Sequence, residues 1–171
     1  TLIKKLTDNF KKNKLSNSII FFGSKGLGKS TLAFNFINEI FKDFELNNQH
    51  NSQPNLIYNN THPNLKYINK QYDEKTNKLK KNITINQIRN LESFFHQSSF
   101  NNLPKFIIID SIDDLNINSS NALLKTLEEP KNNTYIILIS HQLSNVLPTI
   151  RSRCIKFQIN TPNINEFEQI L

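Results

Sequence analysis

Apolar residues in this chain occur in two patterns, which indicate two kinds of secondary structure. Short continuous runs bounded by polar residues are typical of strands that are covered on both faces of a parallel sheet. The strands expected from such runs are Ser18–Phe22, Leu65–Ile68, Phe106–Asp110 and Tyr135–Ser140, with a short extended piece at Ile83–Ile85 and an alternating strand at Cys154–Ile159.

Other apolar residues recur three or four positions apart, which is the spacing of one face of an α-helix. The expected helices are Leu2–Phe10, Lys29–Phe41, a helix from its N-cap Asn86 to about Gln97, and Asn118–Glu129, which Pro130 ends; a short turn or helix follows at Pro148–Ser152. Because strands and helices alternate along the chain, we expect an α/β fold with a mostly parallel five-stranded sheet flanked by helices.

Two polar segments lie between these elements. Residues 43–63 are rich in Asn and have no apolar period, which predicts a long surface connection. Residues 69–82 are dense in charge and predict a mobile hairpin or loop. We therefore expect one domain over residues 1–160 with an Asn-rich surface insertion at about 43–82. Thr161-Pro162 breaks the pattern, and residues 163–171 resemble the start of a new helix.

Composition narrows the range of partners and compartments. The 171 residues carry a formal net charge of +7, which favours an anionic partner such as nucleotide or nucleic acid, although a lysine-rich solvated surface would look the same. The single cysteine, Cys154, excludes a disulfide framework and a four-thiolate zinc site within the chain, and a small buried core residue is its simplest role. No apolar run approaches the roughly 18 residues that span a membrane, so we expect a soluble, cytoplasmic protein.

Glycine is the most informative residue type, because the chain has only three and all lie between positions 23 and 28. Turns elsewhere must therefore use Asn, Asp or Pro. The spacing G-x-x-x-x-G-K-S, placed between a strand and a helix, is typical of a loop that holds a phosphate chain. The predicted nucleotide-binding residues are Gly23, Ser24, Lys25, Gly26, Leu27, Gly28, Lys29, Ser30 and Thr31.

Each part of this loop has a physical role. The glycines allow successive backbone N–H groups to form an anion-binding nest, and the dipole of the following helix acts at the same place. Lys29 is expected to reach the β- and γ-phosphates, and the Ser30 hydroxyl to ligate Mg²⁺. Asp110 ends a neighbouring strand, where we expect it to hold the water shell of that metal ion. The predicted cofactor is ATP or ADP with Mg²⁺.

Hydrolysis needs one more group, a base or a residue that positions water. In many such ATPases a Glu directly follows the strand-end Asp, but here that position is Ser111, and serine is not a comparable base near neutral pH. Asp113 and Asp114 lie too far along the chain to replace it and are expected to be acids of a loop or helix start. The sequence thus separates nucleotide binding from nucleotide hydrolysis.

Two longer motifs carry a resemblance to a known family. The segment Ala122–Pro130 (ALLKTLEEP), followed by Ser152-Arg153-Cys154, resembles the clamp-loader branch of the AAA+ ATPases. The similarity runs from about Leu15 to Ile159 and is greatest to the delta-prime family of bacterial DNA polymerase III subunits. In the tau/gamma motor subunit, Asp110 would be followed by Glu. Three features suit delta-prime better: His62-Pro63-Asn64-Leu65, Ile83-Thr84-Ile85 before a helix, and Ile109-Asp110-Ser111.

This resemblance implies further roles and partners. Arg153 would be an arginine finger that reaches the γ-phosphate bound by a neighbouring subunit, and Ser140 would be the first sensor residue, which orients water or γ-phosphate. The partners would be tau/gamma and delta subunits, with the sliding clamp and primed DNA met through the assembly. The four-cysteine zinc module of many relatives is absent, so we infer no zinc site. Residues 161–171 would begin a helical lid, and the rest of the lid and the collar lie outside the chain.

The sequence leaves several functions open. The first hypothesis is a non-motor clamp-loader subunit that binds nucleotide and is at most a weak ATPase alone. The second is an ATP-hydrolysing, tau/gamma-like motor subunit, which Ser111 disfavours. A stand-alone P-loop nucleotide kinase would need an arginine-rich lid, and the chain has only Arg89, Arg151 and Arg153. A DNA-binding module that has lost nucleotide use is the fourth hypothesis.

Overall fold

A single parallel sheet forms the centre of the molecule. The computed structural model describes residues 1–48, 57, 59, 61–73, 76–129 and 131–160. The sheet has five strands in the order β2-β3-β4-β1-β5, and every neighbouring pair is parallel. The strands are β1 (Ser18–Phe22), β2 (Leu65–Asn69), β3 (Lys105–Asp110), β4 (Thr134–Ser140) and β5 (Ile155–Gln158). The predicted α/β class and strand number are confirmed.

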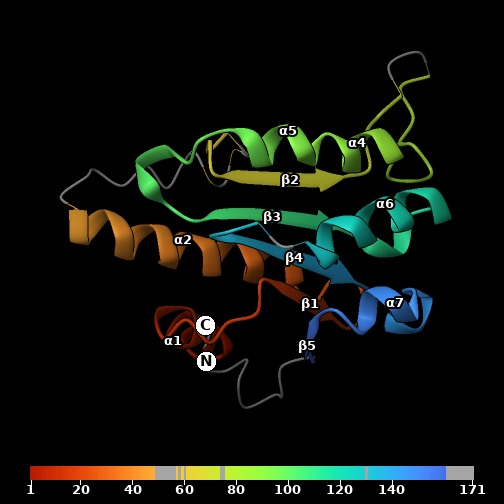
Figure 1. Cartoon of the computed structure of the whole chain (residues 1–171). Helices are drawn as coiled ribbons and strands as arrows, with labels where there is room; N and C mark the ends of the chain where they lie inside the picture. The colour runs from red at the N-terminus through yellow and green to blue at the C-terminus, as the bar shows by residue number, and fades with distance from the viewer. Residues whose placement is uncertain (49–56, 58, 60, 74–75, 130, 161–171) are drawn as a thin grey trace.

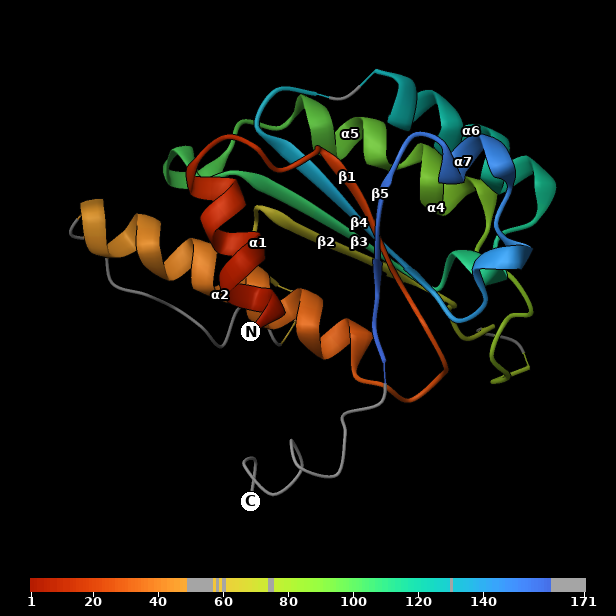
Figure 2. The same ribbon diagram turned by 90° about the horizontal axis from the view of Figure 1, so that it is seen from below.

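Helices cover both faces of this sheet (Figures 1 and 2). One face carries α1 (Leu2–Lys11) and α2 (Lys29–Asn48). The opposite face carries α4 (Ile85–Arg89), α5 (Leu91–His96), α6 (Ile117–Glu128) and α7 (Pro148–Arg151). Three short 3₁₀ turns complete the described elements: η1 (Phe100–Asn102), η2 (Ile112–Asp114) and η3 (Leu143–Asn145).

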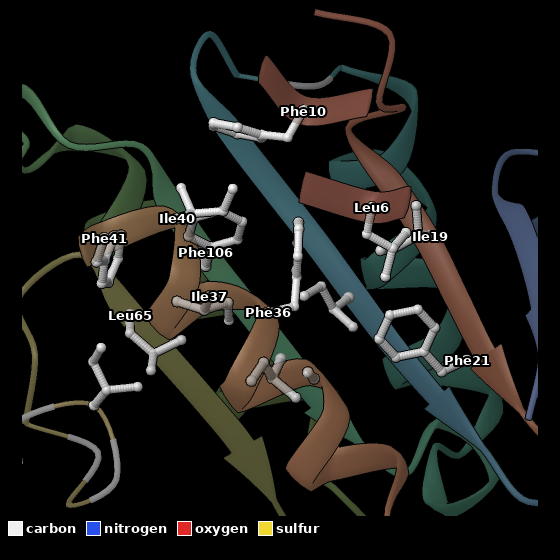
Figure 3. Close-up of a cluster of buried hydrophobic side chains, with 14 of the residues drawn as sticks. Leu6, Phe10, Ile19, Phe21, Phe36, Ile37, Ile40, Phe41, Leu65 and Phe106 are labelled. Atoms are coloured by element: carbon white, nitrogen blue, oxygen red, sulfur yellow. The ribbon is translucent and has the colours of Figure 1, made fainter. Parts of the chain in front are cut away.

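The continuous apolar runs of the sequence fill both layers of the core. Along β3, Phe106 and Ile108 face α1 and α2, whereas Ile107 and Ile109 face the other helical layer. Figure 3 shows the first of these clusters, in which Phe36 of α2 and Phe10 of α1 gather around Phe106. A strand buried on both sides has no polar face, which explains why these runs do not alternate.

Helix α2 is longer than its apolar spacing predicts. It continues to Asn48, so the expectation that the surface connection begins at residue 43 is wrong for residues 43–48. Phe44 packs against the core and its ring lies 6.3 Å from that of Phe10, while Asp43 forms a 2.7 Å ion pair with Lys11. Contacts with α1 therefore extend the helix into a polar sequence.

The helix predicted from Asn86 to Gln97 is also corrected, because it consists of two helices and begins earlier. Thr84, not Asn86, is the N-cap of α4. The Thr84 side chain accepts a hydrogen bond from the backbone of Gln87, and the Gln87 side chain accepts one from the backbone of Thr84. This reciprocal pair is a capping box, which satisfies donors that a helix start leaves unpaired.

Asparagine takes over the backbone role of glycine, as the composition predicts. Among the described residues, five asparagines have a positive φ, namely Asn13, Asn77, Asn101, Asn102 and Asn133. In the charged segment after β2, Tyr72 pairs antiparallel with Leu79. Within the described residues, no helix is both long and apolar enough to cross a membrane. Most of the Asn-rich connection before Thr61, the closure by Pro130 and the expected lid helix at 161–171 lie outside the described residues.

Candidate functional site

The three glycines shape the loop that joins β1 to α2. Gly26 and Gly28 have φ values of +88° and +71°, a left-handed conformation that side chains disfavour, and open space surrounds both. Gly23 differs, because a Cβ there would lie 2.2 Å from the backbone oxygen of Ile159. The left-handed backbone of the loop therefore favours glycine at positions 26 and 28. At Gly23, the backbone after β5 passes so close that it leaves no room for a Cβ.

Lys29, the first residue of α2, folds back over this loop. Its ammonium donates hydrogen bonds to the backbone oxygens of Gly23 and Ser24, at 2.7 Å each, and the residue is 3% exposed. Burial lowers the pKa of Lys29, and the carboxylates of Asp110 and Asp113 oppose that effect. The ammonium is therefore a buried donor at the centre of the loop, where phosphate oxygens could replace the two carbonyls.

Ser30 and Asp110 meet as the sequence predicts, although they come from different elements. The Ser30 hydroxyl donates to Asp110 Oδ2 at 2.5 Å, and the Tyr67 hydroxyl donates to the same oxygen at 3.1 Å. Burial, together with Asp110, raises the pKa of Tyr67, so the phenol stays protonated and acts as a donor. A serine oxygen beside a carboxylate suits Mg²⁺, which prefers oxygen ligands and retains several waters. Ser30 and Asp110 thus fit the predicted metal site.

A cleft of about 510 Å³ opens beside these residues. It crosses the carboxyl ends of β1, β4, β3 and β2, and its lining contains Lys25, Gly26, Gly28, Lys29, Ser30, Tyr67, Asn69, Lys70, Leu79, Asp110, Ser111, Asp114, Ile139 and His141. A larger groove of about 830 Å³ is lined by α4, α5 and α6, but its lining includes no residue of the phosphate loop. The smaller cleft is therefore the candidate nucleotide site.

Four of the predicted loop residues lie outside this lining. Gly23 and Ser24 contribute the carbonyls that hold Lys29, and the Leu27 side chain packs near Gly23. Thr31 is exposed on α2.

The acids after β3 hold the surrounding backbone. Asp113 accepts hydrogen bonds from the Ser140 hydroxyl and from the backbone N–H groups of His141 and Gln142. Asp114 forms a 3.0 Å ion pair with Lys70, and the Ser111 hydroxyl lies 3.5 Å from its carboxylate. Both acids are thus engaged in structural contacts, in agreement with their expected place at a loop or helix start.

Ser140 and Arg153 are not brought into this cleft. Ser140 is fully buried and its hydroxyl is directed to Asp113, whereas the next residue, His141, lines the cleft. Arg153 follows α7 and donates to Glu128 Oε1 at 2.7 Å and to the Thr149 backbone oxygen at 2.9 Å. The Arg153 side chain is 35% exposed, so it is accessible from solvent.

Tyr67, Lys70 and His141 are among the cleft side chains that the sequence did not predict. Tyr67 and Lys70 belong to an edge strand and its end, where the motifs of the phosphate loop give no signal. His141 had one available signal, since it directly follows a buried strand that ends beside β1. Residues in that position lie at the same edge of a parallel sheet as the phosphate loop.

Comparisons with known proteins identify the family of this chain. Residues 1–163 match the family model described as "DNA polymerase III, delta subunit". The chain is 38% identical over 101 residues to DNA polymerase III subunit delta' of Pseudomonas aeruginosa, covering 59% of this chain and 29% of that protein. It is 32% identical over 155 residues to the delta' subunit of Bacillus subtilis, covering 90% of this chain and 45% of that protein.

Solved structures show the same fold. A gamma subunit-related protein of DNA polymerase III from Thermotoga maritima superposes with a TM-score of 0.68 at 22% identity, over 98% of this chain and 48% of that one. RuvB from Thermotoga maritima superposes with a TM-score of 0.55 at 15% identity, again over 98% of this chain and 48% of that one. The chain thus spans less than half the length of these relatives. It has the AAA+ fold, and it belongs to the DNA polymerase III delta subunit family, within which its relatives place it with the delta' subunits.

Proposed function

We propose that the chain is the nucleotide-binding domain of a non-motor clamp-loader subunit that acts in DNA replication. The observation that carries the proposal is the juxtaposition of the phosphate loop with Asp110, through the Ser30 hydroxyl. The glycine-rich loop, the buried Lys29 and the side-chain oxygens of Ser30 and Asp110 line one cleft. This set of groups suits ATP or ADP with Mg²⁺.

The same cleft supports binding without efficient turnover. Ser111 occupies the position of the usual glutamate, is 2% exposed, and its hydroxyl lies 3.5 Å from the Asp114 carboxylate. The Tyr67 phenol near Asp110 is no base, because its pKa is raised. When bound, Mg²⁺ would neutralise phosphate charge, with Ser30 as ligand and Asp110 on its water shell. The chain alone would then hold ATP and hydrolyse it negligibly.

We further propose that Arg153 acts on a neighbouring subunit. It lies outside the lining of its own cleft, is accessible, and is held by a surface pair with Glu128. Exposed pairs of this kind contribute about 0–1 kcal/mol, so docking of a neighbour can release the guanidinium. The planar guanidinium of Arg153 would then donate hydrogen bonds that stabilise negative charge on the transferred phosphoryl group. The neighbours would be tau/gamma and delta subunits in a cytoplasmic assembly that places a sliding clamp on primed DNA.

The arginine proposal is tested in the reconstituted assembly. Arg153→Ala should lower single-turnover hydrolysis at the adjoining site by about 10³-fold, the contribution typical of an arginine finger. The variant's own affinity for Mg–ATP should not change. Lys156→Ala removes a nearby exposed positive charge and is the matched control. Equal hydrolysis rates in assemblies with and without Arg153 would remove the finger role.

A further inference from the structure

A groove of about 620 Å³ runs between α1 and α2, on the face of the sheet opposite to α7. Its walls are α1 as far as Lys11 and the stretch of α2 from Asn35 to Asp43. Figure 2 shows the two helices packed against each other. At about 1.5 Å per helical residue, the stretch of α2 is about 12 Å long, which matches about four residues of an extended chain. The groove is therefore long enough for a peptide segment, and it is far larger than the volume of one water, about 30 Å³.

Two buried side chains of this groove have unpaired polar atoms. Asn38 of α2 and Thr7 of α1 are 6% and 9% exposed, and both line the groove. Neither Asn38 Oδ1 nor Thr7 Oγ1 has a hydrogen-bond partner in the part of the chain that the structure describes. A buried polar atom without a partner costs free energy, and native proteins generally satisfy such atoms. Two unpaired atoms from two different helices therefore indicate a ligand that enters the groove between them.

The charged side chains that line the groove are balanced and largely paired. Three lysines and three acids occur in the lining. Lys11 lies 2.7 Å from Asp43, Lys42 lies 3.4 Å from Glu39, and the third lysine and third acid are one helical turn apart on α1. A nucleic acid would need an excess of positive charge, which these side chains do not provide. The groove thus favours an uncharged ligand that forms hydrogen bonds.

A peptide backbone has the hydrogen-bonding groups that this groove requires. The carboxamide of Asn38 carries a donor and an acceptor side by side, so it is complementary to a peptide unit whichever way the amide is oriented. The Thr7 hydroxyl can donate or accept. An extended segment presents an N–H and a C=O group at every residue other than proline. One short segment can therefore satisfy both side chains, which come from opposite walls of the groove.

We propose that the groove between α1 and α2 binds an extended, uncharged peptide segment of a neighbouring subunit, whose backbone pairs with Asn38 and Thr7. This inference rests on the proposed place of the chain in a clamp-loader assembly and adds a second contact surface to it. Arg153 follows α7 on the other face of the sheet. The groove and Arg153 therefore contact different parts of the assembly.

The test measures binding of the intact protein to purified tau/gamma and delta subunits by biolayer interferometry. Asn38→Leu and Thr7→Val remove the hydrogen-bonding groups at nearly constant volume. Each should weaken binding to the subunit that carries the segment by about tenfold, as expected for the loss of a buried hydrogen bond. Because both atoms are unpaired in the free protein, neither change should lower the free energy of unfolding in urea. Asn86→Leu, at an exposed asparagine outside the groove, is the matched control.

A second pair of variants tests the groove without altering either unpaired atom. Asp8→Trp places a large side chain at the exposed rim and should weaken binding by at least about tenfold. Lys5→Trp changes an exposed residue of the same helix that does not line the groove, and should leave binding unchanged.

The possible results separate this inference from the proposed function. Unchanged binding in Asn38→Leu and Asp8→Trp would overturn the inference while leaving the assembly in place. A loss of stability in both Asn38→Leu and Thr7→Val would also overturn it, because ordered water would then already satisfy the two atoms in the free protein. If the unaltered protein binds neither subunit, the proposed function fails and the inference fails with it.

Discussion

His62 makes the stability of this domain depend on pH in a way that one substitution can isolate. The residue is 5% exposed, its ring stacks on Phe41 with centroids 4.3 Å apart, and its Nδ1 accepts a 3.1 Å hydrogen bond from the backbone of Asn64. Burial lowers the pKa of His62 from 6.5 to about 4. The folded protein therefore keeps this imidazole neutral under conditions in which the unfolded chain protonates it.

The sign and size of the effect follow from that difference. Because the unfolded state binds the extra proton, stability is fully present above the unfolded pKa and is lost as pH falls from 6.5 toward about 4. At about 1.4 kcal/mol per pH unit, the whole window corresponds to about 3 kcal/mol. Between about pH 7.5 and about pH 5, His62 alone should lower the free energy of unfolding by about 2 kcal/mol.

Urea unfolding followed by circular dichroism at the two pH values measures this change. His62→Asn keeps an acceptor near the Asn64 N–H group but cannot gain a proton. The variant should be less stable at the higher pH, because ring stacking is lost, yet its stability should depend less on pH, by about 2 kcal/mol over the same range. His96→Asn, at an exposed histidine, should behave like the unaltered protein. An equal pH dependence in the unaltered protein and in His62→Asn would refute this account of His62.

Three further substitutions test how the fold is held together. Lys105→Met should lower the free energy of unfolding by about 1–3 kcal/mol, because the buried ammonium donates hydrogen bonds to backbone carbonyls at the end of α5, including that of Gln97. An unchanged midpoint in urea titrations would contradict this role. Gly23→Ala should cost more than about 2 kcal/mol, since its Cβ would collide with the Ile159 backbone, whereas Gly26→Ala should cost about 1 kcal/mol of backbone strain alone. Equal melting temperatures for the two alanine variants would contradict the asymmetry.

Much of the fold could be predicted because its determinants are local. The apolar runs of β1, β3 and β4 are buried on both faces, so their sequence shows the strand directly. The meeting of Ser30 and Asp110 was also predictable, since the carboxyl ends of parallel strands lie at one edge of a sheet. The two residues are far apart in sequence, and the strand topology alone brings them together.

The remaining features depend on tertiary contacts or on signals that were overlooked. The extension of α2 rests on packing of Phe44 and Asp43 against α1, which no local pattern shows. Thr84 and Gln87 have the spacing of a capping box, a signal that competes with Asn86 as the expected cap. Asn64 is buried, and its side chain forms hydrogen bonds with the backbone of Phe100 and Leu103, which no local pattern predicts.

The site shows the same division between local and tertiary signals. The residues of the phosphate loop are predictable from one local motif. Tyr67 and Lys70 come from an edge strand and its end, and the spacing of residues along the sequence does not show how that strand aligns with β3. The end of β4 was predicted to contribute Ser140, and the structure shows that Asp113 binds its hydroxyl while His141 lines the cleft. Side chains alternate along a strand, so a shift of one residue reverses which group faces the ligand.

If this cleft binds ATP without efficiently hydrolysing it, the chemical state of the nucleotide after binding shows this most directly. The intact protein is incubated with radiolabelled Mg–ATP, bound nucleotide is collected on a filter, and its identity is determined by thin-layer chromatography. We expect the bound nucleotide to remain triphosphate. We also expect the Lys29→Ala variant to retain no nucleotide. Absence of bound nucleotide, or its rapid conversion to diphosphate by the protein alone, would contradict the account.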